Sequence, residues 1–195
     1  MGDQMPVSGY QTPVEAKLPV HGFVLAGGKS SRMGVDKALL PFCGRPMVEI
    51  AVEKLREFCA DVSIAGNREE RVDVGPGAGI EAGLKTAQQE WVMFVPVDVP
   101  LVPVELLRGW VEAVLESGCG ASYLVVKEQR QPAFCVMRRE CLAGVSAALD
   151  RGVRRLDELL RSVAAAEVEV EVESWFMNVN TPEDLAKAEA ASKGE

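Results

Sequence analysis

The sequence predicts an α/β fold: a single Rossmann-like three-layer domain with a mostly parallel central sheet. Two observations predict it. Short apolar runs alternate along the chain with segments of helical periodicity. The run at residues 91–96 is apolar throughout, as expected of a central parallel strand. The 195 residues suit one domain with a sizeable core. We expect a disordered leader at residues 1–18 and one domain over residues 19–195.

Each element follows from its local pattern. Short apolar runs predict strands at residues 20–26, 62–65, 91–96, 121–126 and 133–137. Apolar residues that recur every three or four positions predict helices at residues 46–59, 77–89, 104–116, 139–150 and 156–163. A last helix is expected to follow Thr181, which suits an N-cap, because Pro182 then takes the first helical position and Asp184 the third.

The segment AEVEVEVES alternates valine with glutamate from Glu167 to Glu173. This alternation predicts a half-buried strand with one solvated face. A row of glutamates could also hold a metal ion. We favour a charged outer face that discourages pairing with another strand edge.

Composition excludes several classes of function. The formal net charge of -8 argues against broad electrostatic binding to nucleic acid or to an anionic membrane. The five cysteines contain no C-x-x-C pair, so neither a disulfide framework nor a zinc site is predicted. No apolar run reaches the length of a membrane span, and the first residues carry no signal-peptide core. We expect a cytoplasmic protein with reduced thiols.

The stretch VLAGGKSSRMGVDKALL, residues 24–40, follows the first predicted strand. Its spacing matches neither the P-loop nor G-x-G-x-x-G, because Gly27 and Gly28 are adjacent. Backbone N–H groups after such a pair can form an anion-binding concavity, and Arg32 and Lys37 can bind phosphate oxygens. The stretch from Gly28 to Arg45 contains four cationic residues and one anionic residue. We therefore expect a nucleoside triphosphate site; a plain turn with solvated basic residues is the alternative.

Three other polar positions invite a role. Asp98 follows the strand at residues 91–96, where ligands gather in α/β sheets, and a carboxylate there suits Mg²⁺. A turn aspartate before Pro100 is the alternative. Asn178 and Asn180 lie two residues apart, so an extended backbone places both on one side. They could instead be turn residues before the last helix. His21, the single histidine, is expected to be structural.

The stretch LAGGKSSRMGVDK, from Leu25 to Lys37, resembles the signature L-A-G-G-x-S-x-R-M-G-x-D-K of the molybdenum cofactor guanylyltransferases (molybdopterin-guanine dinucleotide biosynthesis protein A). Later segments resemble further motifs of this family in order and spacing: GPGAGIEAGL, VPVDVPLVP and FMNVNTPEDL. The resemblance covers residues 20–190. It implies a fold of the nucleotide-diphospho-sugar transferase type and transfer of GMP from GTP to the phosphate of molybdenum-molybdopterin, with release of pyrophosphate.

The resemblance also implies roles for individual residues. Catalytic roles fall to Arg32, Lys37 and Asp98, and Asp98 is also the metal ligand for Mg²⁺. Asn178 and Asn180 lie on the acceptor side. The nucleotide-binding residues are Leu25, Ala26, Gly27, Gly28, Ser30, Gly34, Lys37, Asn67, Asp73, Gly75, Gly79 and Asp98. The chain departs from the family at Val97, where the family has Cys, and at Gly77, where it has Leu. The gap between Asp73 and Gly75 is also shorter than in the family, so a purely structural Asp73 is the alternative. We expect Gly77 to loosen a loop near the guanine.

The implied partners are GTP and molybdenum-molybdopterin, with transient contacts to molybdenum insertion proteins and molybdoenzymes left open. We expect a monomer. One alternative is a related nucleotidylyltransferase that uses CTP or another phosphorylated acceptor. Those relatives tend to read L-A-A-G where this chain has Gly27 after Ala26. A second alternative is a cofactor-binding module without turnover, which the presence of Arg32, Lys37 and Asp98 disfavours.

Overall fold

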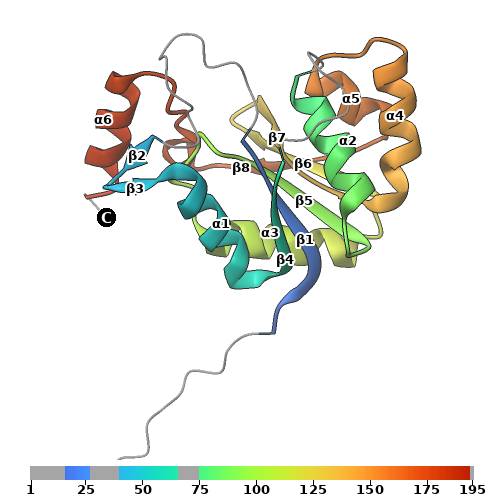
Figure 1. The fold of residues 1–195 in the computed structure, drawn as a ribbon, viewed down its shortest axis with the longest axis horizontal. Helices are drawn as coiled ribbons and strands as arrows, with labels where there is room; N and C mark the ends of the chain where they lie inside the picture. The colour runs from blue at the N-terminus through green and yellow to red at the C-terminus, as the bar shows by residue number, and fades with distance from the viewer. Residues whose placement is uncertain (1–15, 27–39, 66–74, 194–195) are drawn as a thin grey trace, which may run out of the picture.

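The structure is a computed structural model, which describes residues 16–26, 40–65 and 75–193. A six-stranded sheet forms its centre, with the strand order β4-β1-β5-β7-β6-β8 (Figure 1). The strands are β1 (Leu18–Leu25), β4 (Cys59–Ala65), β5 (Trp91–Pro96), β6 (Ala121–Val126), β7 (Gln129–Arg138) and β8 (Ala166–Val170). Of these six strands, β7 alone runs antiparallel to its neighbours. The predicted mostly parallel sheet is confirmed.

Helices cover both faces of the sheet (Figure 1). On one face lie α1 (Met47–Phe58) and α3 (Val104–Ser117); on the other lie α2 (Pro76–Thr86), α4 (Leu142–Asp150) and α5 (Leu156–Ser162). Helices can pack on both faces because the strands carry apolar side chains on both. In β1, for example, successive side chains alternate between the two faces. Val20 and Val24 pack into the core under α1, whereas Phe23 and Leu25 pack into the core under α2. The three predicted layers are therefore present.

Two glycines let the helices approach the sheet closely. A Cβ atom at Gly22 in β1 would lie 3.0 Å from Leu55 Cδ1 of α1. A Cβ atom at Gly83 in α2 would lie only 2.5 Å from Phe94 Cε1 of β5. The contact at Gly83 is closer than carbon atoms tolerate, and the contact at Gly22 is tight, so both glycines allow close packing between the layers.

The chain connections create a switch in strand order beside β1. From β1 the chain crosses through α1 to β4 on one side, and from β4 it crosses back through α2 to β5 on the other side. In α/β sheets, ligands bind beyond the carboxyl ends of strands at such a switch point. The carboxyl ends of β1 and β5 are therefore the expected place for the site.

The observed elements agree with the sequence in kind and differ at several bounds. Strand β5 and strand β6 have the predicted bounds. Strand β4 begins at Cys59, three residues before the prediction, and β7 extends over Gln129–Arg138. The predicted helix at residues 139–150 begins with a 3-10 turn, Arg139–Cys141, before α4.

The first residues of β7 were not predicted as strand because the turn before them gives no sequence signal. Lys127 and Glu128 connect β6 to β7, and both have positive φ, 45° and 68°. Tight hairpin turns of this kind usually carry Asn-Gly or Asp-Gly, so Lys-Glu gives no turn signal. The hairpin of β2 (Pro41–Phe42) and β3 (Arg45–Pro46) was missed because its two-residue strands are too short to show alternation.

The C-terminal part agrees with its predicted pattern. Strand β8 lies at the sheet edge, with Glu167 and Glu169 exposed and Val168 and Val170 half-buried. It ends at Val170, followed by a 3-10 turn, Glu173–Phe176. Helix α6 (Pro182–Ala191) begins after Thr181 with the predicted cap: Asp184 N donates to Thr181 Oγ1 at 3.1 Å.

The C-terminal helix contacts the β2–β3 hairpin, and the start of the chain differs from its prediction. Helix α6 lies beside the β2–β3 hairpin, where Cys43 N donates to Glu189 Oε1 at 2.8 Å (Figure 1). Strand β1 already begins at Leu18, inside the leader predicted at residues 1–18, and residues 1–15 lie outside the described residues. No helix in the described part of the chain combines the length and apolar character needed to cross a membrane.

Candidate active site at the carboxyl edge of the sheet

The carboxyl end of β1 is held by both neighbouring strands. Ala26 N donates to Ala65 O of β4 at 2.9 Å, and Val97 N, just after β5, donates to Leu25 O at 3.2 Å. Leu25 is buried and Ala26 half-buried. The predicted nucleotide residues Leu25 and Ala26 thus lie at the switch point, and the stretch that begins at Gly27 starts from a fixed backbone.

Most of the predicted phosphate loop lies outside the described residues. This applies to Gly27, Gly28, Ser30, Arg32, Gly34 and Lys37, and also to Asn67 and Asp73 after β4. Their roles stay predictions. The residue where the description resumes, Leu40, is buried, and its carbonyl accepts a hydrogen bond from Met47 N at 3.1 Å. The described residues on either side of this stretch, Ala26 and Leu40, thus both take part in backbone hydrogen bonds.

Asp98 lies directly beyond β5, at the same edge as Leu25 and Ala26. It is half-buried between two buried side chains, Val97 and Val99. Its carbonyl oxygen accepts a hydrogen bond from Val179 N at 2.8 Å. This bond joins two segments that lie 81 positions apart in the sequence.

The bond from Val179 brings the two predicted acceptor-side asparagines next to Asp98. Val179 is fully buried, whereas Asn178 and Asn180 on either side of it are exposed. The period-two expectation is therefore met, because both asparagines lie on the side opposite to Val179. The backbone N–H of Asn180 also donates to Asp184 Oδ2 at 3.2 Å, which connects this segment to the cap of α6.

The start of α2 completes this edge. Gly75 has φ 73°, a conformation that favours glycine, and precedes Pro76 at the first helical position. Gly79 is buried in the second turn of α2. Because α2 follows the carboxyl end of β4, its N-terminus, which favours anions, lies at the carboxyl edge of the sheet.

Gly77 differs from its prediction. It lies in the first turn of α2 and not in a loosened loop. A Cβ atom at Gly77 would meet Leu149 Cδ2 of α4 at 3.0 Å. Leu149 and Leu159 occupy the space that a larger side chain would need, so the glycine reflects close packing of α2 against α4 and α5.

The donor set at this edge fits a magnesium ion held jointly with phosphates. Among the residues that the structure describes, no three His, Cys, Asp or Glu side chains are grouped so that they could hold a metal ion. One carboxylate, Asp98, lies there with amide side chains on the neighbouring segment. Mg²⁺ is commonly bound by one or two carboxylates together with water and substrate phosphates, so a single carboxylate is compatible with it.

Lys54 is a residue of this region that the sequence analysis missed. Its Nζ donates to Pro100 O at 2.5 Å and to Val102 O at 2.8 Å, both in the segment that follows Asp98. Burial lowers the pKa of the Lys54 ammonium, and the charges of Glu105 and Glu57 oppose this shift. One signal was available: Lys54 lies four positions from both Ile50 and Phe58, on an apolar stripe of α1.

His21 has the structural role that was expected. Gln88 N donates to its Nδ1 at 3.1 Å, so Nε2 carries the hydrogen and donates to Ser63 Oγ at 2.9 Å. The ring stacks on Phe23, and burial lowers its pKa. It borders a pocket of about 450 Å³ between α2 and β4. Because Nε2 donates to the serine, the histidine cannot act as its base.

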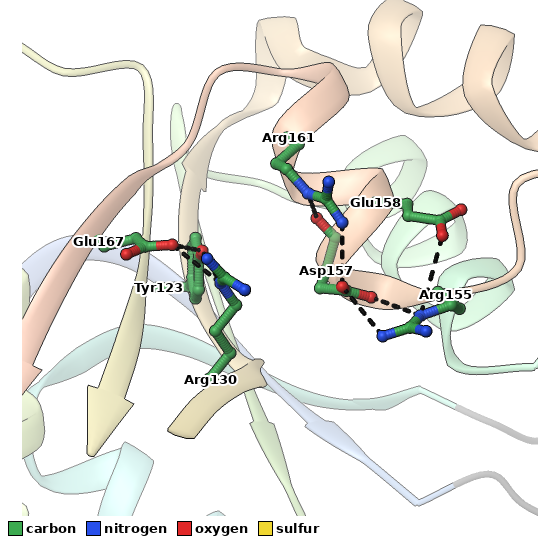
Figure 2. A network of polar contacts seen from close by, with 7 residues as sticks. All are labelled: Tyr123, Arg130, Arg155, Asp157, Glu158, Arg161 and Glu167. Carbon is green, nitrogen blue, oxygen red and sulfur yellow. Dashed lines mark hydrogen bonds and ion pairs between the residues drawn. The ribbon is translucent and has the colours of Figure 1, made fainter. Parts of the chain in front are cut away.

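Two groups of arginine–carboxylate contacts lie at α5 and at the neighbouring strands (Figure 2). Asp157 accepts from Arg155 Nε at 3.0 Å and from Arg161 Nη2 at 3.1 Å. In the second group, Arg130 Nε donates to Glu167 Oε1 at 2.9 Å, and the Tyr123 hydroxyl also donates to this oxygen. These hydrogen bonds lower the pKa of Asp157 and of Glu167. The first group lies within α5 and the residue before it, whereas the second joins the strands β6, β7 and β8.

Comparisons with known proteins show which family the chain resembles. The family model of the MobA-like NTP transferase domain matches residues 22–170. A molybdenum cofactor guanylyltransferase of Yersinia pestis (strain Pestoides F) is 33% identical over 90% of this chain and 98% of that protein.

Two solved structures share the fold. The molybdopterin-guanine dinucleotide biosynthesis protein A of Archaeoglobus fulgidus superposes with a TM-score of 0.72 at 22% identity, over 90% of this chain and 100% of that one. A 2-C-methyl-D-erythritol 4-phosphate cytidylyltransferase of Thermus thermophilus gives 0.64 at 20% identity, over 88% and 98%. These two likenesses concern the fold alone.

Proposed function

This chain belongs to the MobA-like NTP transferase family, and on that premise we propose that it transfers GMP from GTP to the phosphate of molybdenum-molybdopterin. The products are molybdopterin guanine dinucleotide and pyrophosphate. One observation carries the proposal beyond the family match. Backbone hydrogen bonds tie the start of the nucleotide signature at Leu25 to Val97, and Asp98 to Val179, so the segments that resemble family motifs meet at one edge.

The reaction joins two anions, so its main obstacle is charge repulsion. An oxygen of the acceptor phosphate forms a bond to the α-phosphorus of GTP. The bond from this phosphorus to the bridging oxygen breaks, and pyrophosphate leaves with the electron pair. Positioning and electrostatic stabilisation supply most of the catalysis in such transfers. This requirement agrees with the phosphate-binding roles predicted for Arg32 and Lys37, and the acceptor's own phosphate serves as the nucleophile.

We propose that three side chains bind and neutralise the negative charge of the phosphates. Arg32 binds phosphate oxygens through its planar guanidinium, and Lys37 supplies a mobile positive charge. Asp98 would hold Mg²⁺, which would offset negative charge on the phosphates. Asn178 and Asn180 orient the acceptor from the neighbouring segment. The nucleotide is held by the backbone from Leu25 onward and by the glycines at the start of α2.

The base is assigned to guanine. The fold is shared with a cytidylyltransferase of Thermus thermophilus, so the fold alone does not select the base. The Gly27-Gly28 pair and the Yersinia pestis guanylyltransferase at 33% identity favour GTP. The competing possibilities are CTP as donor, another phosphorylated acceptor, and binding without turnover.

The deciding measurement is pyrophosphate release with molybdenum-loaded molybdopterin and Mg²⁺, with GTP, CTP, ATP and UTP offered in parallel. We expect release with GTP alone. Release with CTP alone would overturn the base assignment, and no release from folded protein would overturn the transferase proposal for this acceptor.

A matched pair of variants tests the site. Asp98→Asn should lower the rate at least about 100-fold, because it removes the charge that holds the metal ion. Asp61→Asn is the control: Asp61 lies in the amino-terminal half of β4 and pairs with Gln89 at 2.7 Å. It should leave the rate unchanged. Equal effects of the two substitutions would contradict the role of Asp98.

We place the protein in the cytoplasm. All five cysteines are free thiols, and burial raises the pKa of Cys59 to about 12, which makes this thiol unreactive. Transient contacts with molybdenum insertion proteins and molybdoenzymes would follow from the product, which another protein must take up. Cell fractionation and copurification would test both points.

A further inference from the structure

We infer that Lys54 is a positioning residue for Asp98: its ammonium group holds the segment from Val99 to Val102 and thereby fixes the carboxylate that precedes it. The kinetic consequence rests on the proposed function, whereas the anchoring itself can be tested without it.

The segment that carries Asp98 has little means to hold itself. Between the end of β5 and the start of α3, residues 96–103 read PVDVPLVP, with prolines at positions 96, 100 and 103. Proline has no backbone N–H, so the segment is poor in donors for its own carbonyl groups. Pro100 and Val102 are buried, and a buried carbonyl without a partner is costly.

Lys54 supplies the missing donors. Its Nζ lies 2.5 Å from Pro100 O and 2.8 Å from Val102 O, so one ammonium group binds two carbonyls of the same turn. A lysine ammonium has three donors and carries a charge, which makes such bonds stronger than neutral ones. The side chain comes from α1, which packs on the sheet through the fully buried Leu55 and Phe58, so its base is fixed.

Among the described residues, hydrogen bonds hold this segment before Asp98, at Asp98 and after it. Upstream, Val97 N donates to Leu25 O; at Asp98 itself, the carbonyl accepts from Val179 N; downstream, Lys54 binds Pro100 O. Losing the downstream anchor would let the turn relax on one side of Asp98. Because Val179 is bonded to Asp98, the segment that contains Asn178 and Asn180 would relax with it.

The first arm of the test is hydrogen exchange. Lys54→Met keeps the length of the side chain and removes its donors. We expect amide exchange at residues 97–102 and 177–180 to rise about tenfold, with the rest of the sheet unchanged. The control is Lys85→Met, a lysine of α2 whose amine lies 3.6 Å from Glu81. If exchange in the two segments stays at the wild-type rate, the inference is wrong, whatever the enzyme does.

The second arm is kinetic and separates positioning from general stability. Groups that orient a metal ligand typically change metal affinity 10- to 100-fold, so Lys54→Met should raise the Mg²⁺ concentration for half-maximal rate about 10-fold or more. High Mg²⁺ should restore the rate, and the KM for GTP at saturating Mg²⁺ should stay near wild type. Lys54→Arg, which keeps charge and donors, should recover most of the Mg²⁺ response.

The outcomes are distinguishable. No pyrophosphate release from the wild type would remove the proposed function and leave the exchange result to decide the anchoring. An active wild type with an unchanged Mg²⁺ response in Lys54→Met, despite a lowered melting temperature, would reduce Lys54 to a stabilising residue and overturn the inference. If Lys54→Met fails to fold, Lys54→Gln carries the same comparison.

Discussion

Gly83 lies where helix α2 crosses β5, and a single methyl group at this position would collide with a phenylalanine. An added Cβ would lie 2.5 Å from Phe94 Cε1 and 2.9 Å from Phe94 Cζ. Phe94 is fully buried and cannot swing away. Gly83→Ala should therefore lower the free energy of unfolding by about 1–3 kcal/mol, as overpacking does, measured by urea denaturation.

Gly109 gives the matched control at the residue scale. It lies on an exposed part of α3, and a Cβ there would meet no atom within 4 Å. Gly109→Ala should raise the free energy of unfolding by about 0.5–1 kcal/mol, because alanine favours a helix interior over glycine. A Gly83→Ala protein as stable as wild type would show that α2 can move away from the sheet.

At the scale of elements, helix α5 begins with a carboxylate that two arginines bind. Asp157, in the first turn, accepts from Arg155 and Arg161, and its side chain is only 15% exposed. The bond from Arg155 is the main cause that holds the pKa of Asp157 below its ordinary value of 3.8. Its folded pKa is lowered, so its stabilising contribution is complete above pH 3.8 and is lost as the pH falls through the folded value.

This sign gives a pH prediction for α5. The difference in unfolding free energy between wild type and Asp157→Asn should be constant well above pH 3.8 and should shrink as the pH falls below it. Urea denaturation over that range measures it. Glu158→Gln is the control, because its carboxylate is 47% exposed and lies 3.8 Å from Arg155. A difference that does not change with pH would show that the ion pairs contribute nothing.

How far the sequence predicts an element depends on the kind of signal the element carries. Strand β5 was predicted to the residue because its apolar run ends at a proline, and α6 because Thr181, Pro182 and Asp184 mark its start. Strand β7 was predicted only in part because a turn of Lys127 and Glu128 needs a positive φ that these residue types do not indicate. The surrounding sheet imposes this turn conformation, so the residue types in the turn do not reveal it.

In the candidate site, too, features with a local sequence signal were predicted and features that depend on distant contacts were not. Asp98 and the Asn178–Asn180 pair were predicted at their positions because each follows or interrupts a recognisable pattern. Their proximity could not be predicted, since it depends on a hydrogen bond between Val179 N and Asp98 O across the fold. Lys54 was missed for a related reason. Its place on an apolar stripe of α1 indicates burial, but the carbonyl groups that it binds belong to the distant segment after β5.

At the scale of the whole molecule, one edge of the sheet collects segments from nearly the full length of the chain. Strand β1 ends there at Leu25, the turn with Asp98 follows β5, and the C-terminal segment around Val179 joins it. Backbone hydrogen bonds from Val97 to Leu25 and from Val179 to Asp98 hold these segments beside one another where they leave the sheet. Placement of this kind is what a transfer between two anions requires.

This arrangement predicts a separation of donor and acceptor effects. Asn178→Ala and Asn180→Ala should each raise the KM for molybdenum-molybdopterin about tenfold or more, as expected for loss of a hydrogen bond to a charged group, while the KM for GTP stays unchanged. Steady-state kinetics with each substrate varied in turn measures both.

Thr181→Ala distinguishes this role from that of turn residues. Thr181 caps α6 through the bond from Asp184 N, and its loss should lower the free energy of unfolding by about 1 kcal/mol without changing either KM. If the asparagine variants behave like Thr181→Ala, losing stability but keeping the KM for the acceptor, then Asn178 and Asn180 serve only to lead the chain into α6. A raised KM for GTP instead would place them on the nucleotide side of Asp98.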